Sequence, residues 1–157
     1  MKPQLWSGSA ISHLPREFIR EDYLISTDPS RLDLPWIHNY LTNDAYWAHG
    51  ISFQVFQKSV ENSLCFGVYH QAAQVGFGRV ISDMATFAYL ADIFIAEKYR
   101  RRGLGKWPVD CILGYPELQG LRRWMLATKD AHGLYEHFGF TPLKRPESMM
   151  EIFKQEI

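Results

Sequence analysis

Residues 89–106 read YLADIFIAEKYRRRGLGK, and this stretch decides the fold. The apolar, β-rich run Thr86–Ile95 predicts a strand that breaks at Glu97-Lys98. Residues 103–115 carry apolar side chains at helical spacing, which predicts a half-buried helix. A further strand is expected at 124–128. A strand, a glycine-containing loop, a helix and a second strand form a crossover unit, so two parallel strands should lie side by side.

The rest of the chain extends this alternation and predicts an α/β fold with a mixed sheet. Residues 1–18 are expected to be a polar N-terminal extension, and residues 19–157 one domain. Other expected elements are strands at 22–26, 63–70, 73–82 and 149–153, with a tight turn at Gln71-Ala72, and helices from Asp28 to about residue 42, from Ser52 to Val60 and from Asp130 to Phe138, the last capped by Gly139.

Composition narrows the class of protein. The chain has 17 Lys plus Arg and 17 Asp plus Glu. This balance argues against a nucleic-acid partner or an anionic-membrane partner, either of which would call for a basic excess. No membrane span or signal peptide is evident, so a cytoplasmic location is expected. Cys65 and Cys111 lie in apolar runs and are expected to be reduced core thiols, and no cluster has metal-ligand spacing.

The loop Arg100–Gly105 has the features of a diphosphate-binding site. A helix start presents unpartnered N–H groups, glycines let a phosphate approach the backbone, and arginines add charged donors. The alternative is a solvated basic turn that caps a helix. No Walker pattern is present, and the glycine spacing differs from that of a dinucleotide-binding loop.

Two motifs resemble those of the GNAT superfamily of N-acetyltransferases. Arg100-x-x-Gly103-x-Gly105 after a strand is similar to the acetyl-CoA motif of that family. Residues 131–140, AHGLYEHFGF, are similar to its Ala-x-x-Leu-Tyr-x-x-x-Gly-Phe segment. One departure is Thr128, since many members carry Asn there. The resemblance covers about residues 20 to 155.

The resemblance implies a sheet with helices on both faces, whose fourth and fifth strands splay apart around acetyl-CoA. Diverging strands leave backbone groups that can pair with the amides of the pantetheine arm. The positions that the resemblance assigns to the cofactor are Ile93, Phe94, Ile95, Arg100, Arg101, Arg102, Gly103, Leu104, Gly105, Lys106, Thr128, Ala131 and Leu134.

The resemblance also implies catalytic roles. An alkylamine with a pKa of about 10.4 must lose a proton before it attacks a thioester. Asp92 stands where the family often has an acidic residue and is the candidate general base. Its alternative roles are a hydrogen bond to loop backbone or a contact with a substrate cation. Tyr135 matches the family tyrosine that protonates the leaving thiolate, and its alternative is a packing role.

The acceptor is expected near Trp36, Tyr40 and Trp47, because this region walls the acceptor site in the family. Aromatic rings there can hold a cationic amine, or they can simply pack two helices on the sheet. The expected function is acetyl transfer to a small-molecule primary amine. The alternatives are a protein or peptide N-acetyltransferase and a non-catalytic acyl-CoA-binding domain, and a homodimer is left open.

Overall fold

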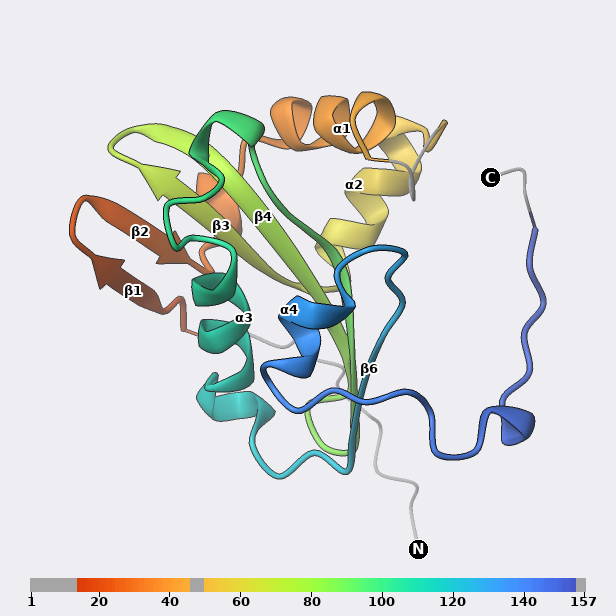
Figure 1. The fold of residues 1–157 in the computed structure, drawn as a ribbon. Helices are drawn as coiled ribbons and strands as arrows, with labels where there is room; N and C mark the ends of the chain where they lie inside the picture. Colours follow the sequence, from red (N-terminus) through yellow and green to blue (C-terminus); the bar gives the residue numbers. More distant parts are fainter. Residues whose placement is uncertain (1–13, 46–49, 155–157) are drawn as a thin grey trace, which may run out of the picture.

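The chain folds around one mixed six-stranded sheet, in the order β1-β2-β3-β4-β5-β6 (Figure 1). The computed structural model describes residues 14–45 and 50–154. Neighbouring strands are antiparallel except β5 and β6, which run parallel as the crossover unit predicts. The strands are β1 Glu17–Arg20, β2 Tyr23–Ser26, β3 Leu64–His70, β4 Ala73–Ser82, β5 Phe87–Ile95 and β6 Arg123–Leu126.

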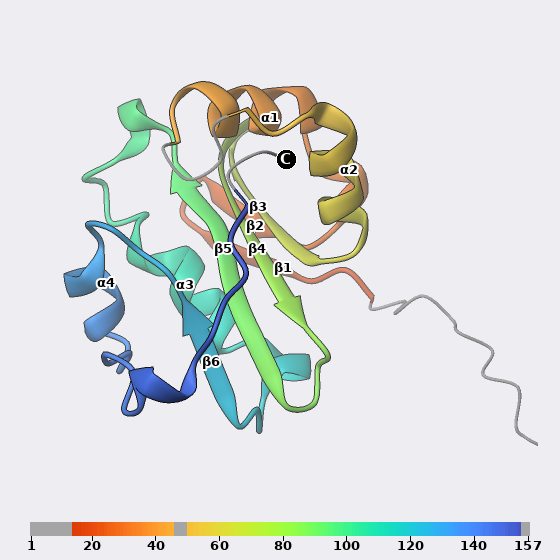
Figure 2. The same ribbon diagram turned by 90° about the vertical axis from the view of Figure 1, so that its right-hand side faces the viewer.

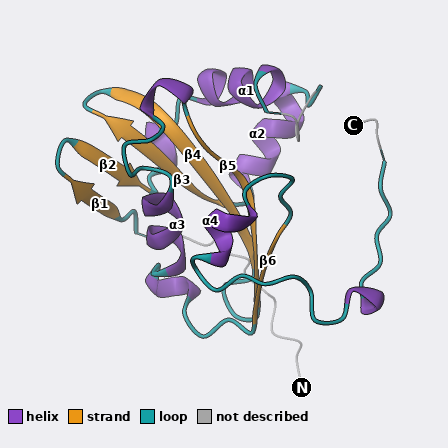
Figure 3. Cartoon of the chain, viewed as in Figure 1, coloured by secondary structure: helices purple, strands orange, loops and turns teal. Residues whose placement is uncertain are grey.

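Helices cover both faces of the sheet, as expected (Figures 1 and 2). Helices α1 and α2 bury Ile37 and Phe56 in one apolar cluster, together with Phe77 and Phe94 of the sheet. The other cluster joins α3 to the opposite face. The helices are α1 Leu34–Asn43, α2 Phe53–Glu61, α3 Lys106–Leu113 and α4 His132–Glu136 (Figure 3).

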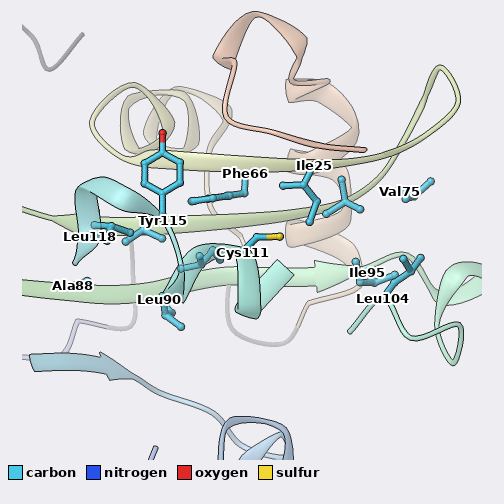
Figure 4. Packing of buried hydrophobic residues seen from close by; sticks show 13 residues of the cluster. Ile25, Phe66, Val75, Ala88, Leu90, Ile95, Leu104, Cys111, Tyr115 and Leu118 are labelled. Atoms are coloured by element: carbon cyan, nitrogen blue, oxygen red, sulfur yellow. The ribbon is translucent and has the colours of Figure 1, made fainter. Parts of the chain in front are cut away.

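The larger core cluster fixes α3 beneath the strands that border the site (Figure 4). Tyr115, which follows α3, is fully buried, and its ring meets that of Phe66 edge-on at 5.4 Å. Its hydroxyl lies 3.4 Å from Thr27 Oγ1, so the buried polar atom has a partner. Burial of such apolar surface stabilises the packing of α3 against the sheet.

Strands β5 and β6 separate toward their carboxyl ends. Their pairing runs from Phe87–Arg123 to Leu90–Leu126, where β6 ends. Strand β5 continues to Ile95. Strands β5 and β6 correspond to the fourth and fifth predicted strands, because β1 was not predicted. The splay that was expected between these two strands is present.

A β-bulge marks the point of separation. Phe77 pairs with Phe94 and Arg79 pairs with Ala91, so β5 carries one extra residue here. Asp92 lies in this bulge with a φ of 55°, in the left-handed region that Asp tolerates better than most residues. The bulge interrupts the regular alternation of side chains and lets consecutive residues face one cavity.

Two helices begin later than predicted. Asp28 caps only a short 3-10 turn, and α1 starts at Leu34 with Asp33 as its cap. Pro35 explains the late start, because proline is tolerated only in the first turn of a helix. Helix α3 starts at Lys106 rather than residue 103, since Gly103 has a φ of +75°, which no α-helix accommodates.

Both ends of the described chain also differ from the prediction. Strand β1 was not expected, and it begins at Glu17, within the predicted extension 1–18. The strand expected at 149–153 is wrong: these residues form no strand, and their side chains are exposed. The apolar pattern was read correctly, but a strand requires a neighbouring strand, and within the part of the chain that is described none lies beside it.

Candidate active site

A pocket of about 650 Å³ lies where β5 and β6 separate. Its walls come from β5, the loop before α3, the end of α1, and α4 with the segment that precedes it. Both proposed catalytic residues, Asp92 and Tyr135, line it. Of the predicted cofactor and substrate positions, it also contains Ile93, Phe94, Ile95, Arg100, Gly105, Thr128, Ala131, Leu134 and Tyr40.

Asp92 forms an ion pair inside the pocket. Arg79 Nε donates to Asp92 Oδ2 at 2.9 Å, and the two side chains are only 14% and 13% exposed. Arg79 Nη1 also donates to Ser63 Oγ at 3.1 Å, which fixes the guanidinium on β4. The pair therefore orients the Asp92 carboxylate, and Arg79 is one of its partners.

Arg100 links the loop before α3 to the end of β5 and to α1. Its Nε donates to the Ile95 carbonyl at 2.9 Å, and its Nη2 donates to the Tyr40 hydroxyl at 2.6 Å. The Tyr40 ring stacks on Phe94 with centroids 3.8 Å apart and planes 9° from parallel. Two elements predicted to have different roles, the loop and the acceptor wall, are thus joined at the end of β5.

The remainder of the loop is positioned from the N-terminal hairpin. Arg20 Nη1 donates to the Gly103 carbonyl at 3.3 Å, and the Arg20 guanidinium lies 5.9 Å from the Trp107 ring centroid. Leu104 is only 2% exposed, so its side chain serves the core. The loop positions that do not line the pocket are Arg101, Arg102, Gly103, Leu104 and Lys106.

Thr128 and Tyr135 stand on the β6 side. The Thr128 hydroxyl accepts a hydrogen bond from the Ala131 N–H at 3.0 Å, so this side chain organises the approach to α4. Tyr135 is partly buried, and its ring meets Phe140 edge-on at 5.8 Å. Tyr135 therefore packs and faces the pocket at the same time, and the two roles that the sequence left open are compatible.

Of the residues that were predicted to bind the acceptor, only some line the pocket. Tyr40 lines the pocket, whereas Trp36 is not among its lining residues and packs at 5.6 Å from Phe94. This contact fits the packing alternative for Trp36, and its role at the acceptor stays a prediction. Trp47 lies outside the described residues.

Sequence reasoning missed several lining residues, among them Arg79, Tyr89, Asp44 and Asp130. Arg79 could have been identified from the sequence, because an arginine in the apolar strand 73–82 needs a partner.

The cysteines are not candidates for covalent catalysis. Both are free and buried, as expected. Burial raises the pKa of Cys65 to about 12 and that of Cys111 to about 11, so both thiols are protonated at neutral pH. Among residues 14–45 and 50–154, no group of three or more His, Cys, Asp or Glu residues is placed to hold a metal, and no helix is long and apolar enough to cross a membrane.

Known proteins are similar to this chain in sequence and architecture. Residues 61–142 match the family described as "Acetyltransferase (GNAT) domain". A protein of Gibberella zeae that is named as an acetyltransferase is 31% identical over 144 residues, spanning 77% of this chain and 80% of its own. The chain belongs to the GNAT acetyltransferase family.

Solved structures agree with this assignment. A protein of Xanthomonas campestris pv. campestris, assigned by its name to the same family, has a TM-score of 0.82 and 48% identity over 84% of this chain and 93% of that one. A Clostridium acetobutylicum protein, described as an acetyltransferase with acetyl-CoA, shares the fold at a TM-score of 0.62 and 11% identity, over 83% of this chain and 94% of that one.

Proposed function

We propose that this chain transfers an acetyl group from acetyl-CoA to the primary amine of a small molecule. The observation that carries the proposal is one pocket of about 650 Å³ that contains Asp92, Tyr135 and the splayed end of β5 together. A carboxylate and a phenol in one cavity supply the base and the acid that acyl transfer to an amine requires.

The donor would lie along β5 and reach the loop before α3. Residues Ala91–Ile95 run beyond the end of β6, so backbone N–H and C=O groups are available to pair with the amides of an extended ligand. Gly105 lines the pocket at the start of α3, where helix N–H groups favour a phosphate. Arg100 adds a cation on the same side. The donor itself supplies a thioester carbonyl.

The proposed chemistry is a direct attack. The amine nitrogen forms a bond to the acetyl carbon, and the carbon–sulfur bond breaks. Asp92 takes the amine proton, directly or through a water, and Tyr135 gives a proton to the departing sulfur. Backbone N–H groups near Ile95 would stabilise the negative oxygen of the intermediate.

The pocket lining supports a cationic acceptor of small size. Three carboxylates, those of Asp44, Asp92 and Asp130, line the cavity with two cations, Arg79 and Arg100. The carboxylates outnumber the cations, and this balance favours a protonated amine. Tyr40 and Tyr89 add aromatic surface suited to cations. Because Tyr40 and Asp44 wall one side of the cavity, it suits a compact acceptor better than an extended peptide.

A panel of acceptors with acetyl-CoA tests the proposal through the release of free thiol. Polyamines, amino acids, aminoglycoside-like compounds and peptides form the panel, and a tertiary-amine analogue of each positive compound is the matched control. We expect release with small primary amines alone. Release with peptides only would favour a protein N-acetyltransferase, and acetyl-CoA binding without release from any acceptor would indicate a binding domain.

A further inference from the structure

Arg79 is a largely buried cation in the wall of the larger pocket. Its side chain is only 14% exposed, and it lines the cavity beside Asp92. Its Nε donates to Asp92 and its Nη1 donates to Ser63, at 2.9 and 3.1 Å. Its Nη2 makes no hydrogen bond with any described residue. A guanidinium has five N–H donors, so this nitrogen remains for a ligand.

The free nitrogen is held in a fixed position. The Ser63 hydroxyl that accepts from Arg79 itself donates to the Ser59 carbonyl of α2 at 2.7 Å. Contacts on both sides therefore fix the plane of the guanidinium, one from the end of α2 and one from the bulge of β5. A donor that is already in place loses little conformational freedom when a ligand binds to it.

The Arg79–Asp92 pair places a positive and a negative group side by side in one cavity. Asp92 is the proposed base, so the reacting amine lies at its carboxylate. A negative group that is close to this amine in the acceptor would then lie beside Arg79. An α-amino acid has this arrangement, because its ammonium and its carboxylate are attached to the same carbon atom.

We propose that the acceptor is an α-amino acid, whose carboxylate accepts from Arg79 Nη2 while its amine reacts at Asp92. This inference rests on the proposed function and narrows its acceptor to amines that carry a neighbouring carboxylate. The α-nitrogen bonds to the acetyl carbon, the carbon–sulfur bond breaks, one proton leaves the nitrogen for Asp92, and one reaches the sulfur from Tyr135. The acceptor carboxylate is bound and does not change.

A simple amine would leave Arg79 unsatisfied. An acceptor that covers the guanidinium without pairing with it would exclude water from a buried donor, and this weakens binding. A carboxylate forms a charge-assisted hydrogen bond there instead. A site built around such a donor discriminates against an analogue that lacks the accepting group. Because Asp44 and Asp130 line the same cavity, a second carboxylate in the amino-acid side chain should be disfavoured.

Paired acceptors test the proposal. Each common amino acid is compared with the amino alcohol that has a hydroxymethyl group in place of the carboxylate, for example leucine with leucinol. Thiol release from acetyl-CoA gives kcat/KM for each acceptor. We expect the amino acid to be favoured by about ten- to a hundredfold, the contribution of a hydrogen bond to a charged group. Free lysine should be acetylated on its α-nitrogen, as shown by mass spectrometry of the product.

Replacement of Arg79 tests the anchor itself. Arg79→Gln should abolish the preference for the amino acid over its amino alcohol. Loss of the contact with Asp92 should slow both acceptors, so the ratio of the two kcat/KM values is the measurement that reports on the anchor. Arg16→Gln is the matched control and should leave the ratio unchanged, because Arg16 pairs with Glu117 at 2.9 Å and does not line the pocket.

The outcomes separate this inference from the proposed function. Turnover of amines without a preference for the carboxylate, or acetylation of lysine on its ε-nitrogen alone, overturns the inference and leaves the proposed function in place. A preference that survives in Arg79→Gln also overturns it. Absence of thiol release with every acceptor overturns both. The comparison of paired acceptors uses the parent protein, so it decides the matter even if Arg79→Gln does not fold.

Discussion

The Tyr40 hydroxyl accepts a hydrogen bond from Arg100 Nη2 at 2.6 Å, although 60 residues separate the two in the sequence. Tyr40 belongs to α1, over one face of the sheet, and Arg100 to the loop that leads into α3 on the other face. Their contact closes the end of β5 from both sides. The hydrogen bond thus links the proposed donor site to the proposed wall of the acceptor site.

Removal of the Tyr40 hydroxyl should loosen Arg100. Tyr40→Phe keeps the ring that stacks on Phe94 but deletes a hydrogen bond worth about 0.5–1.5 kcal/mol. We expect acetyl-CoA binding to weaken by about two- to tenfold, measured by calorimetry. Tyr40→Leu, which also removes the stack, should weaken it further. Equal affinities for all three proteins would mean that Arg100 is held by the Ile95 carbonyl alone.

The backbone at Gly103 offers a test of the loop. Gly103 and Gly120 both have a φ of +75°, so replacement by valine strains each by at least about 1–2 kcal/mol. A Cβ would meet only Arg20 Nη2, at 3.8 Å, in the first case and nothing within 4 Å in the second. Both variants should melt at lower temperature, but only Gly103→Val should lose acetyl-CoA affinity. Unchanged affinity would sink the assignment of the loop.

Deletion of the Tyr135 hydroxyl oxygen tests whether this residue is the proposed acid. Tyr135→Phe should lower kcat by about 10²-fold or more, with little change in acetyl-CoA affinity, because proton donation is lost while the ring still packs on Phe140. Tyr89→Phe is the control, since Tyr89 also lines the pocket. If only the control loses turnover, the acid is Tyr89.

The proposed base is tested through pH. Asp92→Asn retains an oxygen that can accept from Arg79 Nε, so the bulge should persist. We expect kcat/KM to fall by about 10²-fold near neutral pH and to recover as the pH rises, because the free amine then forms without help. Asp44→Asn should change only the KM of the acceptor. A flat pH response in Asp92→Asn would leave Asp92 a structural role.

The turn before β5 should make stability depend on pH. Hydrogen bonds from the Thr86 hydroxyl and from backbone N–H groups of residues 85–87 hold the pKa of Asp83 well below its usual value. A lowered folded-state pKa adds stability above the unfolded value of about 3.9, and this is lost as the pH falls below it.

Urea unfolding can follow this dependence. The difference in the free energy of unfolding between the parent protein and Asp83→Asn should be largest above about pH 5 and should shrink below about pH 4. The same difference at every pH would show that the ionised carboxylate adds nothing to stability.

Much of the fold could be predicted because its signals are local. The hairpin at Gln71-Ala72 and the strand–loop–helix at 86–115 depend on residues within a few positions of one another. Glycine spacing likewise identified the loop, and the chain places Arg100 and Gly105 at the pocket. The helix expected from Asp28 was too long, although Pro35 signals the later start of α1, because proline is tolerated only in the first turn of a helix.

The sequence by itself therefore determined the α/β class, the crossover unit and the two motifs that point to acyl transfer. Only the tertiary structure decided which side chains meet. The Arg79–Asp92 pair depends on a one-residue bulge in β5, and the Tyr40–Arg100 bond depends on how α1 and the loop pack around the sheet. Tertiary structure also decided the fate of the segment 149–153, which was predicted to be a strand. A local pattern can favour an extended chain, but a strand forms only where another backbone lies beside it.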